Sequence, residues 1–147
     1  MALRQTYLAL KTRLPEGAMT VLVMRGRGND ELAPSKELLT LFNRFKKEFY
    51  DGLDGYHDPY TYAWDKSNYE ERFRRQILNN PKAMERLAAL AKEAKDRDIF
   101  LVCYEGEDKP CHRKLLLEIA KEEFDADIDP TPFRPESTEP SSPTLFG

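Results

Sequence analysis

Cysteine is scarce in this sequence, and both long apolar runs and a strong net charge are absent. Two cysteines cannot build a disulfide framework, so we expect reduced thiols and a cytoplasmic setting. No apolar run approaches the roughly 18 residues of a membrane helix, and the N-terminus has no signal-peptide core, so we expect no membrane association. A net charge of −3 is far from the basic profile of a dedicated nucleic-acid binder.

The 147 residues suffice for one domain, but prolines are spread unevenly along them. Half of the ten prolines fall in the last segment, among serines and threonines. Such a segment cannot bury enough apolar surface to offset the entropy of ordering it. We therefore predict a single α/β domain over residues 1–128 and a Pro-rich flexible tail over residues 129–147.

Apolar runs of strand length indicate the sheet. Residues 19–24 and 99–104 are continuous apolar, partly β-branched runs, residues 6–10 form a weaker candidate, and residues 126–129 a short final one. The two strong strands are each followed by helix, which favours parallel pairing. We predict an α/β fold: a compact three-layer domain with a small, mostly parallel sheet flanked by helices.

Helix-start signals mark four helices. Ser35 precedes an apolar stripe at helical spacing, and Asn80 precedes a proline, so both are expected N-caps. Ser67, with Glu70 three residues on, has the pattern of a capping box. The fourth helix is expected from Pro110 to near Phe124.

A long loop is predicted over residues 51–65, before the second helix. Its aromatic residues either stack on a nucleic-acid base or form a flap packed on the core. These residues are Tyr56, His57, Tyr60, Tyr62 and Trp64.

Ligands of open α/β sheets bind beyond the carboxyl ends of the strands, which selects two loops. In the loop that follows residues 19–24, Arg25 and Arg27 are candidates for binding an anion, and the glycines beside them permit close approach of the backbone. The other loop runs from Cys103 to Arg113.

The second loop carries most of the candidate chemistry. Cys111, His112 and Arg113 fall in the first turn of a helix, where free N–H groups and the helix dipole favour an anion. The same field would lower the pKa of the Cys111 thiol, and Arg113 could clamp a phosphate or carboxylate. Glu105 could orient His112 or act as a base.

Thiol chemistry is the alternative use of this loop. Cys103 would be a nucleophile at a strand end and Cys111 a resolving thiol, as in sulfur-transfer or redox proteins. A protein-interaction module, with residues 143–147 as a docking motif, is a third possibility.

A zinc site is a further alternative for this loop. Cys103, Cys111 and His112 are ligand types, and either His57 or Glu105 would have to complete the set. Because the cysteines lack paired C-x-x-C spacing, the sequence predicts no metal.

The motif of this loop resembles that of a known family. An apolar strand ending Cys103-Tyr104-Glu105, followed by Cys111-His112-Arg113 at a helix start, is similar to the domain-of-unknown-function 488 family, in its archaeal-type branch. Residues 32–39, 7–23 and 69–73 support the resemblance, which covers residues 5–128. It implies a compact three-layer α/β domain whose shared polar residues are those of the motif, with Arg25 after the early strand.

The sequence thus predicts an α/β protein that binds or acts on a phosphate-bearing small molecule or a nucleic-acid end. The expected catalytic residues are Cys103, Glu105 and His112. The expected ligand-binding residues are Arg25, Arg27, Cys111 and Arg113. No cofactor is indicated, and a protein partner could bind through the tail.

Overall fold

A three-stranded parallel sheet forms the centre of the computed structural model, which describes residues 1–106 and 109–135. Its strands are β1 (Leu3–Tyr7), β2 (Met19–Leu22) and β3 (Ile99–Cys103), in the order β1-β3-β2. Every residue of β3 is buried, as expected for a central parallel strand covered on both faces. The predicted α/β fold with a small parallel sheet is confirmed.

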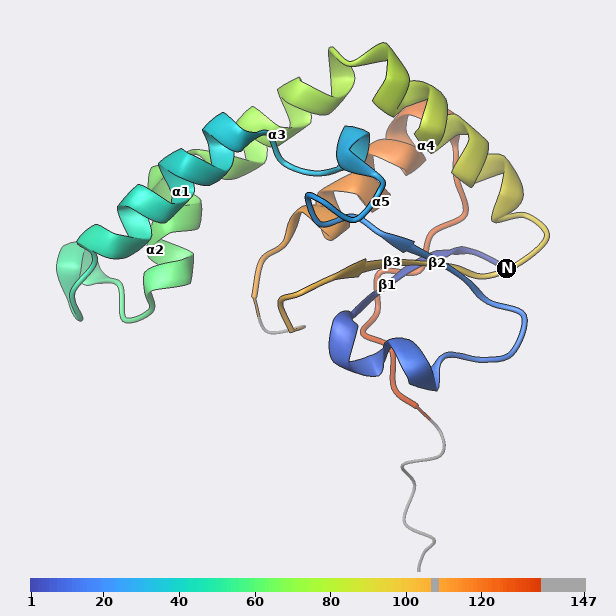
Figure 1. Cartoon of the computed structure of the whole chain (residues 1–147), viewed down its shortest axis with the longest axis horizontal. Coiled ribbons are helices and arrows are strands. Elements are labelled where there is room, and N and C mark those ends of the chain that lie inside the picture. The colour runs from blue at the N-terminus through green and yellow to red at the C-terminus, as the bar shows by residue number, and fades with distance from the viewer. Residues whose placement is uncertain (107–108, 136–147) are drawn as a thin grey trace, which may run out of the picture.

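The described residues also form five α-helices. They are α1 (Lys36–Glu48), α2 (Pro59–Lys66), α3 (Tyr69–Leu78), α4 (Pro81–Glu93) and α5 (His112–Phe124). Helices α4 and α5 cover one face of the sheet, whereas α1, α2 and the start of α3 project to one side as an arm (Figure 1). The carboxyl ends of the strands point toward this arm.

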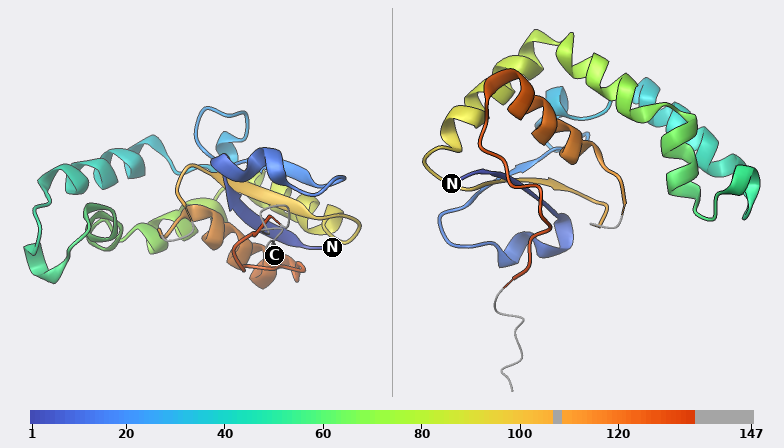
Figure 2. Two further views of the ribbon diagram at one scale, coloured as in Figure 1. Left: turned by 90° about the horizontal axis from the view of Figure 1, so that it is seen from below. Right: turned by 180° about the vertical axis from the view of Figure 1, so that it is seen from behind.

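Alternation along β3 divides the core into two layers. Ile99 and Leu101 face the helices and join the main apolar cluster, while Phe100 and Val102 face the opposite side. That side is covered by the 3₁₀ helix η1 (Leu8–Arg13) and by the chain that follows α5, as the view from behind shows (Figure 2).

The first residues of the predicted tail lie against the sheet. Asp129 N–H donates to the Leu3 carbonyl at 2.9 Å, and the Phe133 ring packs edge-on against Phe100 with centroids 5.3 Å apart. An aromatic side chain among the prolines therefore supplies apolar contact that composition alone did not reveal. The expected docking motif at residues 143–147 lies outside the described residues.

Strand β1 begins and ends earlier than the predicted strand at residues 6–10. It pairs with β3 in the register from Leu3↔Ile99 to Tyr7↔Cys103, so pairing stops where β3 stops. Beyond Tyr7 the chain turns into η1, whose leucines cover Phe100 and Val102. The predicted final strand over 126–129 is reduced to one bridge between Leu3 and Ile128.

The loop predicted over residues 51–65 is wrong in its second half, which forms α2. Asp58 caps this helix by accepting a hydrogen bond from Thr61 N at 2.8 Å, and Pro59 occupies the first helical position. The predicted capping box is also wrong, because Ser67 ends α2 and α3 starts after Asn68 in the left-handed region. The N-caps at Ser35 and Asn80 are confirmed.

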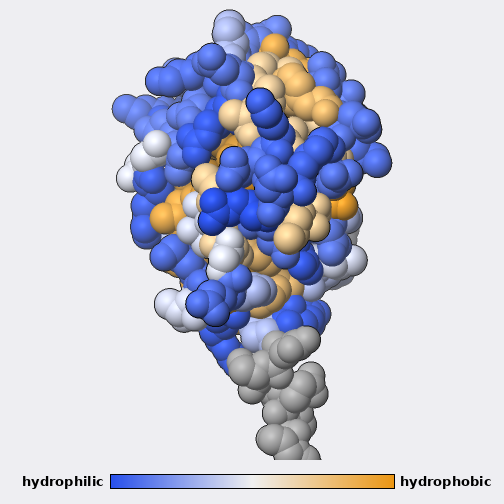
Figure 3. All heavy atoms as spheres, turned by 90° about the vertical axis from the view of Figure 1, so that its right-hand side faces the viewer, coloured by the Kyte–Doolittle hydropathy of each residue, from blue (hydrophilic) through white to orange (hydrophobic). Residues whose placement is uncertain are grey.

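The face of the molecule away from the arm is mostly hydrophilic, with apolar atoms showing between charged side chains (Figure 3). In the described part of the chain, none of the helices combines the length and apolar character needed to cross a membrane.

Candidate functional site

Three chain segments meet at the end of the sheet nearest the arm. Strand β3 ends at Cys103, α5 begins just after Cys111, and the chain leaving β2 passes through Val23. Because the strands are parallel, these ends fall on the same edge of the sheet. Cys103, Glu105, Cys111 and His112 converge there, and we refer to these four residues as the thiol cluster.

The two cysteines of the thiol cluster are free and buried beside each other. The Cys111 thiol donates to the Cys103 sulfur, with the Sγ atoms 2.8 Å apart, and each residue is only 2% exposed. Met24, after β2, packs against both. The structure thus places the two cysteines side by side, and their roles as nucleophile and resolving thiol stay predictions.

Glu105 accepts the last hydrogen bond of a chain that starts at the Cys111 thiol. The Cys103 thiol donates to Glu105 Oε1 at 3.0 Å, and Cys111 Sγ lies 3.7 Å from the same oxygen. Glu105 is half-buried, whereas Cys103 and Cys111 are each only 2% exposed. Its carboxylate is thus the group of the cluster best placed to exchange a proton with a molecule from outside.

His112 is held in one orientation by the backbone. Its Nε2 lies 2.8 Å from the Val23 carbonyl, which can only accept, so Nε2 carries the proton. In the neutral ring, Nδ1 then offers a lone pair, and it lies 3.9 Å from Cys103 Sγ and 3.6 Å from Cys111 Sγ. Phe73 packs edge-on against the ring. Glu105 does not hold this histidine, contrary to one of the two roles considered for it.

The neighbouring Cys111 thiol and burial both make the Cys103 thiol less acidic. The Cys111 thiol beside it and the buried surroundings both raise the pKa of Cys103, although His112 opposes them. A raised pKa is the opposite of what an activated thiol nucleophile requires. Burial also raises the pKa of Tyr60 and of Tyr69, so both phenols keep their protons.

A pocket of about 170 Å³ opens onto the thiol cluster. Its floor includes Cys103, Glu105 and His112, while α1, α2 and α3 supply the aromatic walls. The lining residues are Met24, Arg25, Pro34, Leu39, Phe42, Tyr60, Tyr69, Cys103, Tyr104, Glu105 and His112. Phe42 meets Tyr60 and Tyr69 edge-on, with ring centroids 4.9 and 5.6 Å away.

The walls of this pocket show what the sequence analysis missed. Phe42 and Tyr69 each recur with other apolar residues at helical spacing, and this spacing gives the same signal for a core and for a pocket wall. Tyr60 belonged to the predicted aromatic loop, and the structure packs that segment on α1 as a flap. His57 stands apart from the thiol cluster, exposed and paired with Asp51 at 3.1 Å.

The candidate arginines occupy three different settings. Arg25 lines the pocket, with Nε donating to the Pro34 carbonyl at 2.9 Å and its side chain 29% exposed. Arg27 lies outside the pocket lining, and its guanidinium rests 5.7 Å from the Tyr104 ring centroid.

Arg113 is buried and holds the loop that carries Glu105. Its guanidinium donates to Gln5 Oε1 at 3.0 Å, to the Glu105 carbonyl at 2.9 Å and to the Gly106 carbonyl at 3.2 Å. At 1% exposure and absent from the pocket lining, it is directed toward protein acceptors. Its position explains why a cation stands in the first turn of α5, where the helix dipole disfavours it.

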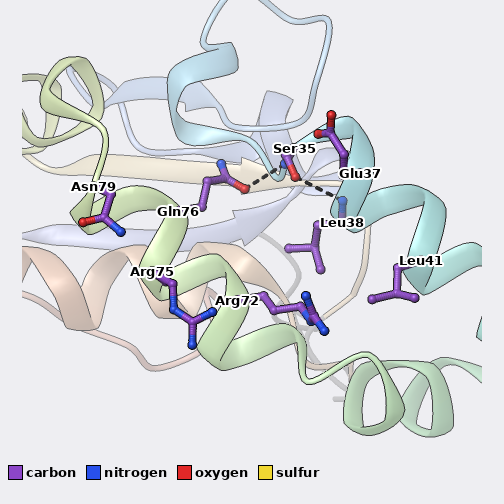
Figure 4. A pocket seen from close by; sticks show the side chains of 8 residues that line it. All are labelled: Ser35, Glu37, Leu38, Leu41, Arg72, Arg75, Gln76 and Asn79. Atoms are coloured by element: carbon purple, nitrogen blue, oxygen red, sulfur yellow. Dashed lines mark hydrogen bonds between the residues drawn. The ribbon is translucent and has the colours of Figure 1, made fainter.

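A larger hollow of about 350 Å³ lies between the start of α1 and α3, away from the thiol cluster. Gln76 bridges the two segments by accepting from Ser35 N at 2.9 Å, while Ser35 Oγ caps Leu38 (Figure 4). Arg75 at its edge pairs with Glu71. These contacts give the hollow a structural explanation, and it contains none of the thiol, imidazole or half-buried carboxylate groups described above.

Comparison with known proteins identifies a family. A family model described as "Active DUF488-N3 subclade" matches residues 28–123. Neither the curated proteins nor the solved structures contain a match to this chain. The matched range includes all four residues of the thiol cluster and most of the pocket lining, while Met24 and Arg25 precede it.

Proposed function

This chain belongs to the DUF488 family, and from that premise we propose that it is an enzyme whose reaction centre is the thiol cluster at the floor of the pocket. The observation that carries the proposal is the convergence of a half-buried carboxylate, two thiols and an oriented imidazole on one small cavity. Groups that exchange protons, gathered in a cleft, are the usual mark of a reaction site.

The size and walls of the pocket define the substrate class. A cavity of about 150 Å³ holds one benzene ring, and the present pocket is close to that size. Phe42, Tyr60 and Tyr69 offer ring faces and edges to a planar group. We therefore propose a substrate whose reacting part is a single planar ring or a fragment of equal size.

An anionic group on the substrate would meet Arg25. This side chain lines the pocket and is partly exposed, and its present ion pair with Asp30 is 3.3 Å long and solvent-accessible. An exposed pair of this kind contributes little stability, so a ligand carboxylate or phosphate can replace it at low cost. Arg27 and Arg113 lie outside the pocket lining and take no part in this contact.

Within the site, Glu105 is proposed as the group that takes up and returns a proton. It is the one member of the thiol cluster that combines a place in the pocket lining with partial exposure. His112 has Nε2 engaged by Val23 and Nδ1 facing the sulfurs, so its role is directed at the thiols. The cytoplasmic setting expected from the sequence stays a prediction.

Ligand-observed NMR with a panel of single-ring carboxylates and nucleoside monophosphates tests this proposal. We expect binding of panel members by the wild-type chain, and its loss in Leu39→Trp, where the larger side chain fills the pocket. Arg25→Ala should weaken binding of the anionic members, and Arg27→Ala, outside the pocket, should leave it unchanged. Equal binding by all three variants, or no binding by the wild type, would contradict the proposed substrate class.

A dithiol redox function is the second candidate, and the Sγ–Sγ distance of 2.8 Å favours it. Two free thiols this close can form a disulfide when two electrons pass to an oxidant such as glutathione disulfide, which leaves as two glutathione thiols. Both cysteines are buried, so exchange with any external thiol or disulfide requires the site to open, which places this function second. Thiol counting after equilibration with glutathione disulfide tests it.

A further inference from the structure

We infer that Cys103, Cys111 and His112 form a zinc site with one coordination position open to the pocket. The inference rests on the proposed function, because the open position would present zinc to the same substrate. The sequence spacing predicted no metal. The structure brings the three candidate ligands together from two elements, β3 and the start of α5, with all three ligand atoms within 4.8 Å of one another.

The distances between the ligand atoms are close to those of a tetrahedral zinc site. With Zn–S bonds of about 2.3 Å and Zn–N bonds of about 2.0 Å, tetrahedral ligand atoms lie roughly 3.5 to 3.8 Å apart. The two sulfur–Nδ1 distances are 3.9 and 3.6 Å, within a few tenths of an ångström of this range. Only the Sγ–Sγ distance of 2.8 Å must lengthen, by about 1 Å, and a rotation of the Cys111 side chain can supply that change.

The surroundings of His112 match those of a metal-bound histidine. Such histidines usually donate their second ring N–H to a carbonyl or carboxylate, which fixes the tautomer and aims the other nitrogen at the metal. Here Nε2 is paired with the Val23 carbonyl at 2.8 Å, and Nδ1 faces both sulfurs. The backbone has therefore already selected the nitrogen that a metal would use.

Charge favours three protein ligands over four. Two thiolates and one neutral imidazole balance the charge of Zn²⁺, which suits a site enclosed by Met24, Phe73 and Tyr69. Glu105 also falls outside the group of residues whose ligand atoms all lie within 4.8 Å of one another. Glu105, half-buried on the pocket floor, is therefore assigned as a neighbour of the metal and not as its ligand.

Three protein ligands with an open fourth position are typical of catalytic zinc, whereas structural zinc has four. Zinc in the open form polarises a carbonyl oxygen or lowers the pKa of a bound water to about 7. Because Cys103 and His112 line the pocket, the open position faces the place assigned to the substrate ring. Glu105 would then stand beside the bound water or carbonyl as the proton acceptor.

Zinc titration of the full chain in reducing buffer, against a chromogenic zinc indicator, tests the inference. We expect one zinc per chain, and tetrahedral Co²⁺ bands with thiolate charge-transfer absorption when cobalt is used instead. Cys111→Ser should weaken zinc binding by at least about 100-fold, since even loss of an outer hydrogen-bond partner costs 10–100-fold. Glu105→Gln keeps all three proposed ligands and should weaken zinc binding less than Cys111→Ser does, by at most the roughly 10–100-fold that loss of an outer hydrogen-bond partner costs.

Wild-type thiol reactivity provides a readout that does not depend on the folding of any variant. The reaction is followed in a urea concentration that partly unfolds the chain and exposes the thiols. Under that condition zinc should protect both cysteines from a maleimide reagent, and a chelator should restore their reaction. Absence of zinc binding, unchanged binding by Cys111→Ser, or loss of binding by Glu105→Gln would overturn the inference.

The pocket variant separates the two proposals. Leu39→Trp should keep zinc binding and lose ligand binding. If the chain binds members of the single-ring panel but no zinc, the proposed function stands and the zinc site is refuted. If it binds zinc but no panel member, the zinc site stands and the proposed substrate class is refuted.

Discussion

Arg113→Met should lower the free energy of unfolding by about 3 kcal/mol. The guanidinium, itself 1% exposed, satisfies Gln5 Oε1 and the carbonyls of the half-buried residues Glu105 and Gly106. Each buried acceptor left without a donor costs roughly 1–3 kcal/mol. Gln5 can turn to other partners, and removing a buried cation returns part of its desolvation cost, so the sum lies in the lower half of the roughly 2–6 kcal/mol range for the two carbonyls.

Urea denaturation followed by circular dichroism measures this change. For a chain of this length, about 3 kcal/mol corresponds to a fall in Tm of roughly 6–12 °C. Arg113→Lys keeps the charge but loses the planar fork, so its effect should be intermediate. Arg75→Met, which breaks only an exposed pair with Glu71, serves as the matched control and should change stability by about 0.5 kcal/mol or less. A loss below about 1 kcal/mol in Arg113→Met would refute the role of Arg113 in holding the Glu105 loop.

Three further predictions concern the stability of the fold. Phe133→Ala should destabilise the chain by about 2–4 kcal/mol in urea titration, because it uncovers Phe100; no measurable effect would show that residues 129–135 do not pack on the sheet. Asn80→Ala should cost about 1 kcal/mol through the lost cap of α4, measured as a shift in Tm, and an unchanged Tm would deny the cap. Burial opposes the shift, but hydrogen bonds from Thr61 and Lys109 lower the pKa of Asp58 to about 2, so its ionised form contributes stability above pH 4 that is lost as the pH falls toward 2. Asp58→Asn should therefore flatten the decline of Tm between pH 4 and pH 2, and an unaltered decline would contradict this linkage.

Local signals in the sequence predicted the elements that depend on neighbouring residues. Ser35 and Asn80 cap helices where expected, since a side-chain oxygen and the next two or three N–H groups decide the contact. Strand β3 was predicted from its continuous apolar run, which follows from burial on both faces. Helix α2 was not predicted, because its aromatic residues were interpreted as part of a loop. Asp58 followed by Pro59 is a helix-start signal that could have identified it.

The sequence could predict which residues of the site lie near one another, but not the direction of their side chains. Parallel strands and a following helix start were enough to place Cys103, Glu105, Cys111 and His112 near one another. The direction of a side chain depends on partners distant in sequence, such as the Val23 carbonyl for His112 and Gln5 for Arg113. For the same reason Tyr69, from α3, could be predicted as apolar and inward-facing but not as a pocket wall.

X-ray diffraction at the zinc absorption edge, from crystals of the full chain grown with zinc and a reductant, tests the central claim most directly. The account predicts one anomalous peak about 2.3 Å from both cysteine sulfurs and about 2.0 Å from His112 Nδ1, with Glu105 beside it and outside bonding distance. A Cys103–Cys111 disulfide, or a peak held by other residues while the thiol cluster stays empty, would contradict it.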